Sequence, residues 1–475
     1  MKSLGFRLFR KKTVQASTHT TLAASAAIPD SGFTFVTNSQ GASGALAEFT
    51  NAISAALDFI DLQDDSEDGP FKSQIARLEG AVGEYSNSDV ESYHELKNWT
   101  TTESTATLIN AAFQCAASVY NVEPRATANT GLDDSFVLHG HREPKAFGVK
   151  FTEMNYLKPS IGGTAKAMGV WKIQSETHPS ANDSLQALVI AIRGTASQLD
   201  HMVNINGRSE SVYDFFQLDR HQFLQKFDSL SAHSGFLGGA KALIPRVIDV
   251  ISQAQSTNVK HIILTGHSAG GAVASLVFMK LLLTFADKEP SLKLSCITFG
   301  APPTLSADIT KALRSEPKFR NQHGPNIAFV NEFDLVPRAD QTYIRSLIDI
   351  YRSLYNLEPL MVDAIRKDNE KVDEHSYVLP PLIFGDKNNI EAISKLNQGR
   401  CWQLPQAEYN IIGDLVLLRK VREEGNVRQI LLAQSISLLD YQSLVYCGIE
   451  THSRTHYGER IHLLQKGKFN HNTSW

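Results

Sequence analysis

The sequence predicts an α/β protein whose central sheet is mostly parallel and flanked by helices. From about residue 147 onward, short β-branched runs alternate with amphipathic stretches. Such alternation is typical of right-handed βαβ crossovers, which produce parallel strands. The run 185–192, Leu-Gln-Ala-Leu-Val-Ile-Ala-Ile, is nearly all apolar. A strand with that composition is expected to be covered by helices on both faces.

The same patterns give the order of the elements. Strands are predicted at 167–174, 185–192, 261–265, 292–299, 326–330 and 413–419, and helices at 239–254, 269–285 and 307–314. Ahead of them, helical spacing over 46–85 and again over 105–120 predicts an N-terminal helical extension. We therefore expect a disordered or targeting tail over 1–45, a helical layer over 46–130 and an α/β domain over 131–470.

The composition argues against several classes of protein. The 475 residues include 46 basic and 50 acidic side chains, a net charge of −4, so the chain has no overall attraction to nucleic acid. The four cysteines lie far apart without a CxxC pair, which argues against a disulfide framework and a structural metal. Because the apolar runs are shorter than the roughly 18 residues that a membrane-spanning helix needs, we expect no transmembrane segment.

The first 29 residues are basic and rich in Ser, Thr and Ala. They contain Lys2, Arg7, Arg10, Lys11 and Lys12, and the first acidic residue is Asp30. No apolar core of the kind found in secretory signals follows the basic cluster. We therefore expect an intracellular protein, in the cytoplasm, with a mitochondrial presequence as the alternative. A basic tail that touches anionic lipid, or a terminus without a role, is also compatible with this composition.

A glycine-rich turn carries the main chemical signal. The sequence Gly266-His-Ser268-Ala-Gly270 follows an apolar strand and precedes a helix. In that context G-x-S-x-G forms a sharp turn that exposes a nucleophilic serine. Glycines fit on either side of the serine because the turn brings those positions close together. Ser268 is the predicted nucleophile, and the alternative is a turn whose serine has no chemical role.

A nucleophilic serine needs a base that a carboxylate orients. In α/β hydrolases the chain order is serine, acid, histidine. The apolar strand 326–330 ends in a loop that contains Glu332 and Asp334 and is closed by Pro337. The carboxyl ends of parallel strands meet at the sheet edge where ligands bind. We predict Asp334 as the acid, with Glu332 as the alternative.

The histidine is harder to assign because the chain has 16. A base that returns to the sheet edge should follow the last predicted strand, 413–419. The segment 451–460 meets this condition and contains two histidines. We predict His452 as the base, with His456 as the alternative. His375 precedes that strand and is a weaker candidate.

An oxyanion hole requires two backbone N–H donors close to the serine. One is expected from Ala269, the residue after the nucleophile. The other is expected from Thr195, because Gly194 permits a tight turn directly after the strand 185–192. The N–H group of Thr195 can then face the substrate oxygen.

These residues resemble the fungal-type class 3 lipases, α/β hydrolases that act on acylglycerols. Five ordered motifs carry the resemblance, at 191–195 (Ala-Ile-Arg-Gly-Thr), 232–236 (Ala-His-Ser-Gly-Phe), 266–270 (Gly-His-Ser-Ala-Gly), 297–302 (Ile-Thr-Phe-Gly-Ala-Pro) and 331–337 (Asn-Glu-Phe-Asp-Leu-Val-Pro). The segment from His452 to Arg460 looks like the family's histidine segment. The resemblance covers about 150–460 and leaves 1–90 outside.

The resemblance implies an α/β-hydrolase domain with a Ser268–His452–Asp334 triad and with Thr195 and Ala269 as oxyanion donors. It also implies a lid over 196–205. The chain departs from the family at His201, where members often carry Trp, and at Ala269, where they carry a bulkier residue that would narrow the acyl pocket. The charged segment 206–232 is longer than a simple lid and receives no assigned role.

The implied activity is hydrolysis of acylglycerol esters through an acyl-enzyme, without a metal or a cofactor. A lipid or ester substrate and transient contact with a lipid interface are the implied partners. Because one triad serves many acyl substrates, phospholipids and short-chain or feruloyl-type esters remain alternatives. Peptide hydrolysis on the same fold, and a lipase-like scaffold that binds partners without turnover, also remain.

Overall fold

A nine-stranded sheet runs through the part of the chain that the computed structural model describes, in the order β1-β11-β10-β9-β8-β7-β4-β3-β2. The described residues are 76, 78–91, 96–120, 144–157, 166–176, 185–194, 208–227, 229–255, 259–285, 291–319, 323–353, 401–422 and 429–470. A separate pair of short strands, β5 (Ser209–Ser211) and β6 (Ser231–His233), lies outside this sheet.

The middle of the large sheet is parallel. It consists of β4 (Ala187–Ile192), β7 (His261–His267), β8 (Lys293–Phe299), β9 (His323–Asn331) and β10 (Asp414–Arg422). Antiparallel strands extend both edges: β3 (Met168–Ser175) and β2 (Val149–Leu157) lie beyond β4, and β11 (Gln429–Ser435) and β1 (Lys97–Asn98) lie beyond β10. The carboxyl ends of the five parallel strands therefore share one edge, where a site can be built.

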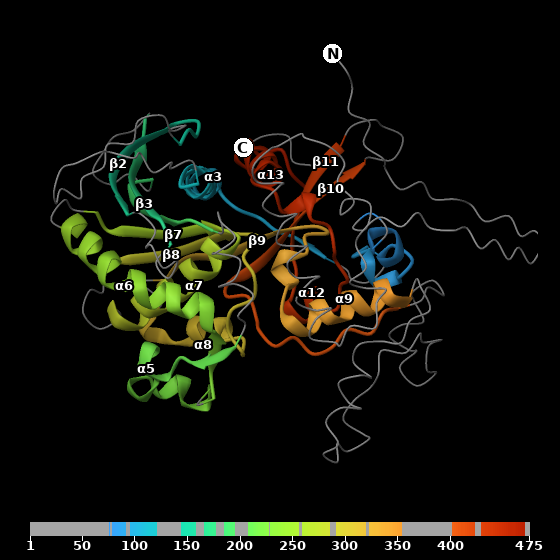
Figure 1. The fold of residues 1–475 in the computed structure, drawn as a ribbon. Helices are drawn as coiled ribbons and strands as arrows, with labels where there is room; N and C mark the ends of the chain where they lie inside the picture. The colour runs from blue at the N-terminus through green and yellow to red at the C-terminus, as the bar shows by residue number, and fades with distance from the viewer. Residues whose placement is uncertain are drawn as a thin grey trace, which may run out of the picture.

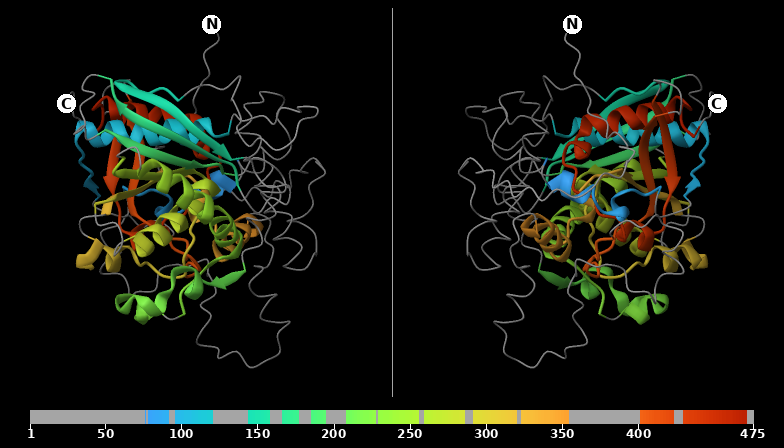
Figure 2. Two further views of the ribbon diagram at one scale, coloured as in Figure 1. Left: turned by 90° about the vertical axis from the view of Figure 1, so that its left-hand side faces the viewer. Right: turned by 90° about the vertical axis from the view of Figure 1, so that its right-hand side faces the viewer.

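Helices cover both faces of this sheet (Figure 1). On one face, α6 (Ser234–Gln255) and α7 (Ala269–Phe285) pack against the side chains of Leu188, Ile190 and Leu264. On the other, α3 (Glu103–Ser118) and α13 (Arg454–Gln465) pack against Val189 and Ile263. Because neighbouring residues of a strand point to opposite faces, an all-apolar strand serves both cores. Figure 2 shows the two layers from the sides.

The remaining described helices lie in the connections between these elements. These are α5 (Tyr213–Phe216), α8 (Thr310–Ser315), α9 (Gln341–Ser353) and α12 (Leu438–Gln442), with 3-10 turns η1 (Ser86–Ser88), η2 (Leu218–Arg220), η3 (Gln222–Phe227), η4 (Pro317–Phe319), η5 (Val336–Arg338) and η7 (Glu450–His452). A helical turn over 78–82 packs with α9 into a further apolar cluster that includes Leu78, Val82, Leu347, Cys447 and Ile449.

The predicted fold class is confirmed, because the sheet is mostly parallel in its middle and has helices on both faces, the arrangement of an α/β hydrolase. Each predicted strand appears within a few residues of its expected position, and α7 has the predicted ends. The helix expected at 105–120 is α3. The structure adds β2, β11, α9 and α13, which the sequence patterns did not reveal.

Some expectations fall outside the described residues. The tail over 1–45 and the helical spacing over 46–75 belong to this group, so the boundaries of the three expected domains remain predictions. Within the described ranges, the helices are all too short or too polar to cross a bilayer.

Candidate active site

The nucleophile predicted from the sequence occupies a strained turn between β7 and α7. Ser268 has a φ of 56°, a left-handed conformation that a residue with a side chain seldom adopts. A Cβ on Gly266 would come within 2.6 Å of the carbonyl oxygen of Gly270, and one on Gly270 would lie 2.7 Å from the nitrogen of Gly194. Glycine is therefore required at both positions, as the close approach expected of this turn demands. The Ser268 residue is only partly buried.

Of the two expected oxyanion donors, Ala269 belongs to the part of the chain that the structure describes. Ala269 is buried and begins α7, directly after Ser268. Thr195 lies outside the described residues, as do the expected lid over 196–205 with His201, and also His375. Gly194, the residue before Thr195, is described and lies against Gly270. The loop that continues to Thr195 thus starts beside the nucleophile turn.

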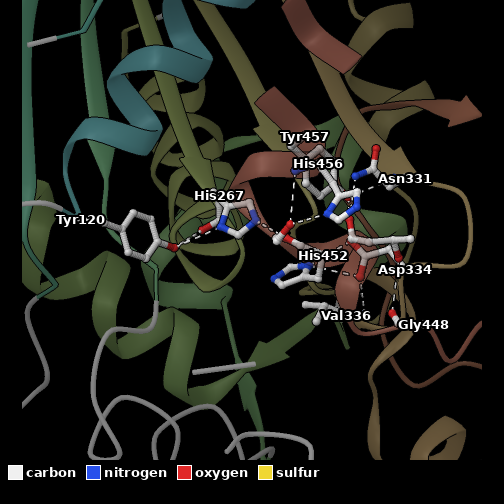
Figure 3. A network of polar contacts seen from close by, with 11 residues as sticks. Tyr120, His267, Asn331, Asp334, Val336, Gly448, His452, His456 and Tyr457 are labelled. Carbon is white, nitrogen blue, oxygen red and sulfur yellow. Dashed lines mark hydrogen bonds and ion pairs between the residues drawn. The ribbon is translucent and has the colours of Figure 1, made fainter. Parts of the chain in front are cut away.

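The predicted acid and base are hydrogen bonded. His452 Nδ1 lies 2.9 Å from Oδ2 and 3.1 Å from Oδ1 of Asp334 (Figure 3). Both side chains are buried. A carboxylate only accepts, so Nδ1 carries the proton, and in a neutral ring Nε2 is then the acceptor that a general base requires.

Two further donors complete the hydrogen bonding of the Asp334 carboxylate. The hydroxyl of Tyr457 donates to Oδ2 at 2.7 Å, and the backbone N–H of Val336 donates to Oδ1 at 2.9 Å. Burial, followed by the charge of Asp334, raises the pKa of Tyr457 well above its ordinary value. The phenol therefore stays protonated and remains a donor. The Tyr457 oxygen also accepts the N–H of Asn331 at 3.0 Å.

A short ladder joins the loop of the acid to the loop of the base. The N–H of Gly448 donates to the carbonyl of Phe333 at 2.7 Å, and the N–H of Leu335 donates to the carbonyl of Gly448 at 3.0 Å. The Asn331 amide adds a 2.7 Å bond to the carbonyl of Thr451. Asp334 and His452, which are 118 positions apart, are thereby held at a fixed separation.

Gly300 connects this pair with the nucleophile turn. Its φ is 60°, and a Cβ there would stand 2.9 Å from His452 Cε1 and 2.9 Å from the Tyr457 hydroxyl. The preceding residue, Phe299, accepts the N–H of Ser268 at 2.9 Å. Ser268 and the imidazole of His452 are therefore both neighbours of the dipeptide 299–300.

The alternative acid and the alternative base have other partners. Glu332 forms an ion pair with the buried Arg419 at 2.8 Å, and its burial raises the pKa of its carboxyl although Arg419 opposes that shift. His456 Nδ1 lies 2.6 Å from the hydroxyl of Ser453, the residue that caps α13. Burial, together with nearby Arg460, lowers the pKa of His456.

Several residues at this site received no role from the sequence. His267 and Gly300 stand inside quoted motifs and Tyr457 inside the histidine segment, whereas Tyr120 lies two residues after α3. A glycine directly after a buried strand was the available signal for Gly300. Tyr120 is brought to the site by long-range packing, and the hydrogen-bond partners of His267 and Tyr457 are far away in the sequence, which leaves no local pattern.

The geometry agrees with the comparison of the chain with known families. Residues 189–343 match the class 3 lipases. This segment includes the nucleophile turn and the loop of Asp334, so the similarity to class 3 lipases covers two of the three predicted triad residues. His452 lies beyond its end.

Two curated plant proteins and several crystal structures are similar to the chain. Protein EDS1 and Protein EDS1L of Arabidopsis thaliana are each 32% identical to it over 139 residues, which is 27% of this chain and 22% of theirs. The chain thus matches less than a quarter of the length of these relatives.

Among solved structures, the chain is similar to the lipase of Rhizopus microsporus var. chinensis, with a TM-score of 0.34 and 19% sequence identity. The alignment covers 52% of this chain and 72% of that lipase. The Lip2 lipase of Yarrowia lipolytica aligns at 0.32 and 17% identity, covering 52% and 78%.

Proposed function

We propose that the chain is a serine carboxylic-ester hydrolase that acts on acylglycerol lipids. The observation that carries the proposal is the buried His452–Asp334 hydrogen bond of 2.9 Å beside a serine held at positive φ at the carboxyl edge of the sheet. The match of residues 189–343 to the class 3 lipases supports it independently.

In the proposed reaction, the hydroxyl of Ser268 attacks the ester carbonyl while His452 Nε2 takes its proton. Asp334 stabilises the imidazolium that forms, through the bond to Nδ1. The backbone N–H groups of Ala269 and Thr195 stabilise the oxyanion. The protonated His452 then gives its proton to the leaving alcohol, and water attacks the acyl-enzyme to release the fatty acid and regenerate Ser268.

The environment of Asp334 suits this role. Its carboxylate is fully buried, so the imidazolium forms where water does not screen the attraction between the two charges. Tyr457 and Val336 fix the carboxylate from two sides. A fixed, preorganised charge stabilises the transition state without a reorganisation cost.

Covalent labelling tests the proposal directly. A fluorophosphonate probe is expected to label the wild-type chain at Ser268 and to leave Ser268→Ala unlabelled. Ser252→Ala on the exposed side of α6 serves as the matched control and should label like the wild type. Absence of labelling in the wild type would contradict the proposal and favour a lipase-like scaffold without turnover.

A substrate panel tests the acylglycerol assignment. Tri-, di- and monoacylglycerols, phospholipids, short-chain esters and feruloyl esters are compared with and without an interface. We expect the highest kcat/KM for an acylglycerol. A higher value for a phospholipid, a feruloyl ester or a short-chain ester would replace the substrate class while keeping Ser268 as the nucleophile.

A further inference from the structure

Tyr120 reaches the nucleophile turn from the turn just after α3, outside the segment that matches the class 3 lipases. Its hydroxyl donates to the backbone carbonyl of His267 at 3.2 Å and lies 3.3 Å from Nδ1 of the same histidine. Figure 3 shows the phenol pointing at His267 from the side opposite His452. His267 is the residue directly before Ser268.

His267 continues the connection to the proposed base. Its Nε2 lies 2.8 Å from the backbone carbonyl oxygen of His452. A carbonyl only accepts, so Nε2 carries a proton and donates. The two imidazole rings lie 4.6 Å apart at an interplanar angle of 32°. His267 is fully buried, and it therefore fixes the backbone from which the His452 ring projects.

The same hydroxyl lies against the expected oxyanion loop. A Cβ on Gly194 would collide with the Tyr120 oxygen, and it would come within 2.6 Å of the His267 carbonyl. Glycine is thus the only residue type at position 194 that lets β4, the end of β7 and Tyr120 meet at this point. Tyr120 contacts the residue that precedes Thr195 as well as the residue that precedes Ser268.

The segment of the base also contacts Tyr120. The guanidinium of Arg454, two residues after His452, lies 4.3 Å from the centre of the Tyr120 ring, a cation–π geometry. Tyr120 therefore touches three segments that the reaction must keep in register: the loop at Gly194, the turn at His267 and the segment after His452.

We propose that Tyr120 and His267 are positioning residues that set the His452 imidazole and the Gly194 loop relative to Ser268. The inference rests on the proposed function, in which these three segments supply the base, an oxyanion donor and the nucleophile. Neither residue takes part in proton transfer. They act through the carbonyl of His452 and through the space that Gly194 leaves open.

Three substitutions separate positioning from general packing. Tyr120→Phe removes the hydroxyl and keeps the ring that Arg454 covers. His267→Gln keeps an N–H donor at the position of Nε2, whereas His267→Asn carries its donor at the position of Nδ1 and leaves the His452 carbonyl without it. Tyr213→Phe on the partly exposed α5 is the matched control for loss of a phenol.

Kinetics with a chromogenic ester give the first readout. We expect kcat to fall about tenfold for Tyr120→Phe and about a hundredfold for His267→Asn, since small displacements of catalytic groups have effects of that size. KM should change less than about twofold, and His267→Gln should recover kcat to within about threefold of the wild type. Wild-type kcat in both Tyr120→Phe and His267→Asn would overturn the proposal, and so would a loss confined to KM.

A second readout does not depend on turnover. The proton in the His452–Asp334 bond should give a low-field NMR resonance, which should be absent in His452→Ala. We expect Tyr120→Phe and His267→Asn to shift it and His267→Gln to restore it. If the wild type is neither labelled nor active, the proposed function fails, and this resonance alone decides the positioning: a shift supports it and an unchanged signal overturns it. If His267→Asn does not fold, Tyr120→Phe decides in both readouts.

Discussion

Asn87 and Trp402 are joined by a reciprocal pair of hydrogen bonds. The Asn87 amide nitrogen donates to the carbonyl of Trp402 at 2.9 Å, and the N–H of Trp402 donates to the Asn87 amide oxygen at 3.0 Å. The same amide also donates to the carbonyl of Ser443 at 2.9 Å. One buried side chain thus ties the N-terminal part of the chain to two segments that flank the C-terminal strands.

Replacing Asn87 with Ala should destabilise the fold. The substitution removes a hydrogen bond to the buried N–H of Trp402, one to the buried carbonyl of Trp402 and one to the partly buried carbonyl of Ser443. We expect a loss of about 1–3 kcal/mol in the free energy of unfolding. Asn98→Ala, at an exposed position in β1, should stay within about 0.5 kcal/mol of the wild type. Urea denaturation of both variants measures the difference, and equal midpoints would show that the Asn87 bonds add no net stability.

His452 and His456 should differ sharply in their effect on turnover. His452→Ala removes the imidazole bound to Asp334 and should lower kcat by about 10⁴-fold, as for other members of such triads. His456→Ala removes a ring that bonds to Ser453 at the cap of α13 and should lower kcat by less than about tenfold. Steady-state kinetics on a chromogenic ester compare the two. A large loss only in His456→Ala would reverse the assignment of the base.

Gly300→Ala should impair activity and stability together. The new methyl group would be placed at a φ of 60° and 2.9 Å from both His452 Cε1 and the Tyr457 hydroxyl. We expect the free energy of unfolding to fall by about 1–3 kcal/mol. We also expect kcat to fall at least tenfold, because His452 must move. A Cβ at Gly238 in α6 would have no neighbour within 4 Å, so Gly238→Ala should instead raise the free energy of unfolding by about 0.4–1 kcal/mol. Thermal unfolding and ester kinetics measure both.

Glu79 should make stability depend on pH. Burial, and then the neighbouring Glu450 carboxylate, raise the pKa of Glu79 from 4.5 to about 7. Between these values the folded chain holds a proton that the unfolded chain releases. Its contribution to stability is therefore present below pH 4.5 and is lost as the pH rises through about 7.

Glu79→Gln should remove this dependence. The variant should gain stability over the wild type as the pH rises from about 5 to about 8, because its neutral amide is not forced to ionise beside Glu450. Glu84→Gln, at an exposed position in the same segment, is the control. Denaturation at several pH values gives the difference, and a gain that does not vary with pH would argue against the raised pKa.

The positions of the parallel strands along the chain could be predicted from the sequence because each is an apolar run that two layers of helices cover. The outer antiparallel strands β2 and β11 could not, since polar residues in them break the apolar run. In β2, Lys150, Thr152 and Glu153 are exposed. The polar residues of α13 similarly hide a helix that is buried through only some of its positions.

The nucleophile turn was predictable because its requirements are local. Glycines two residues before and after Ser268 follow from the sterics of a strand that turns into a helix. The choice between Asp334 and Glu332 was not local, because both follow the same strand. Arg419 from β10 pairs with Glu332, and a contact between residues 87 positions apart leaves no sign in the spacing of the motif. The 147 positions between Tyr120 and His267 explain in the same way why their contact could not be foreseen.

The segment that matches the class 3 lipases includes only the middle strands of the large sheet, from β4 to β9. A recombinant piece limited to 189–343 would hold Ser268 and Asp334, yet β4 would lack β3 and β9 would lack β10. The unpaired edges of β4 and β9 could then form backbone hydrogen bonds with other copies of the same piece. The apolar face of the sheet that α3 and α13 cover would be exposed to water. We therefore expect the matched residues to need the flanking strands β3 and β10 and the covering helices α3 and α13 in order to fold.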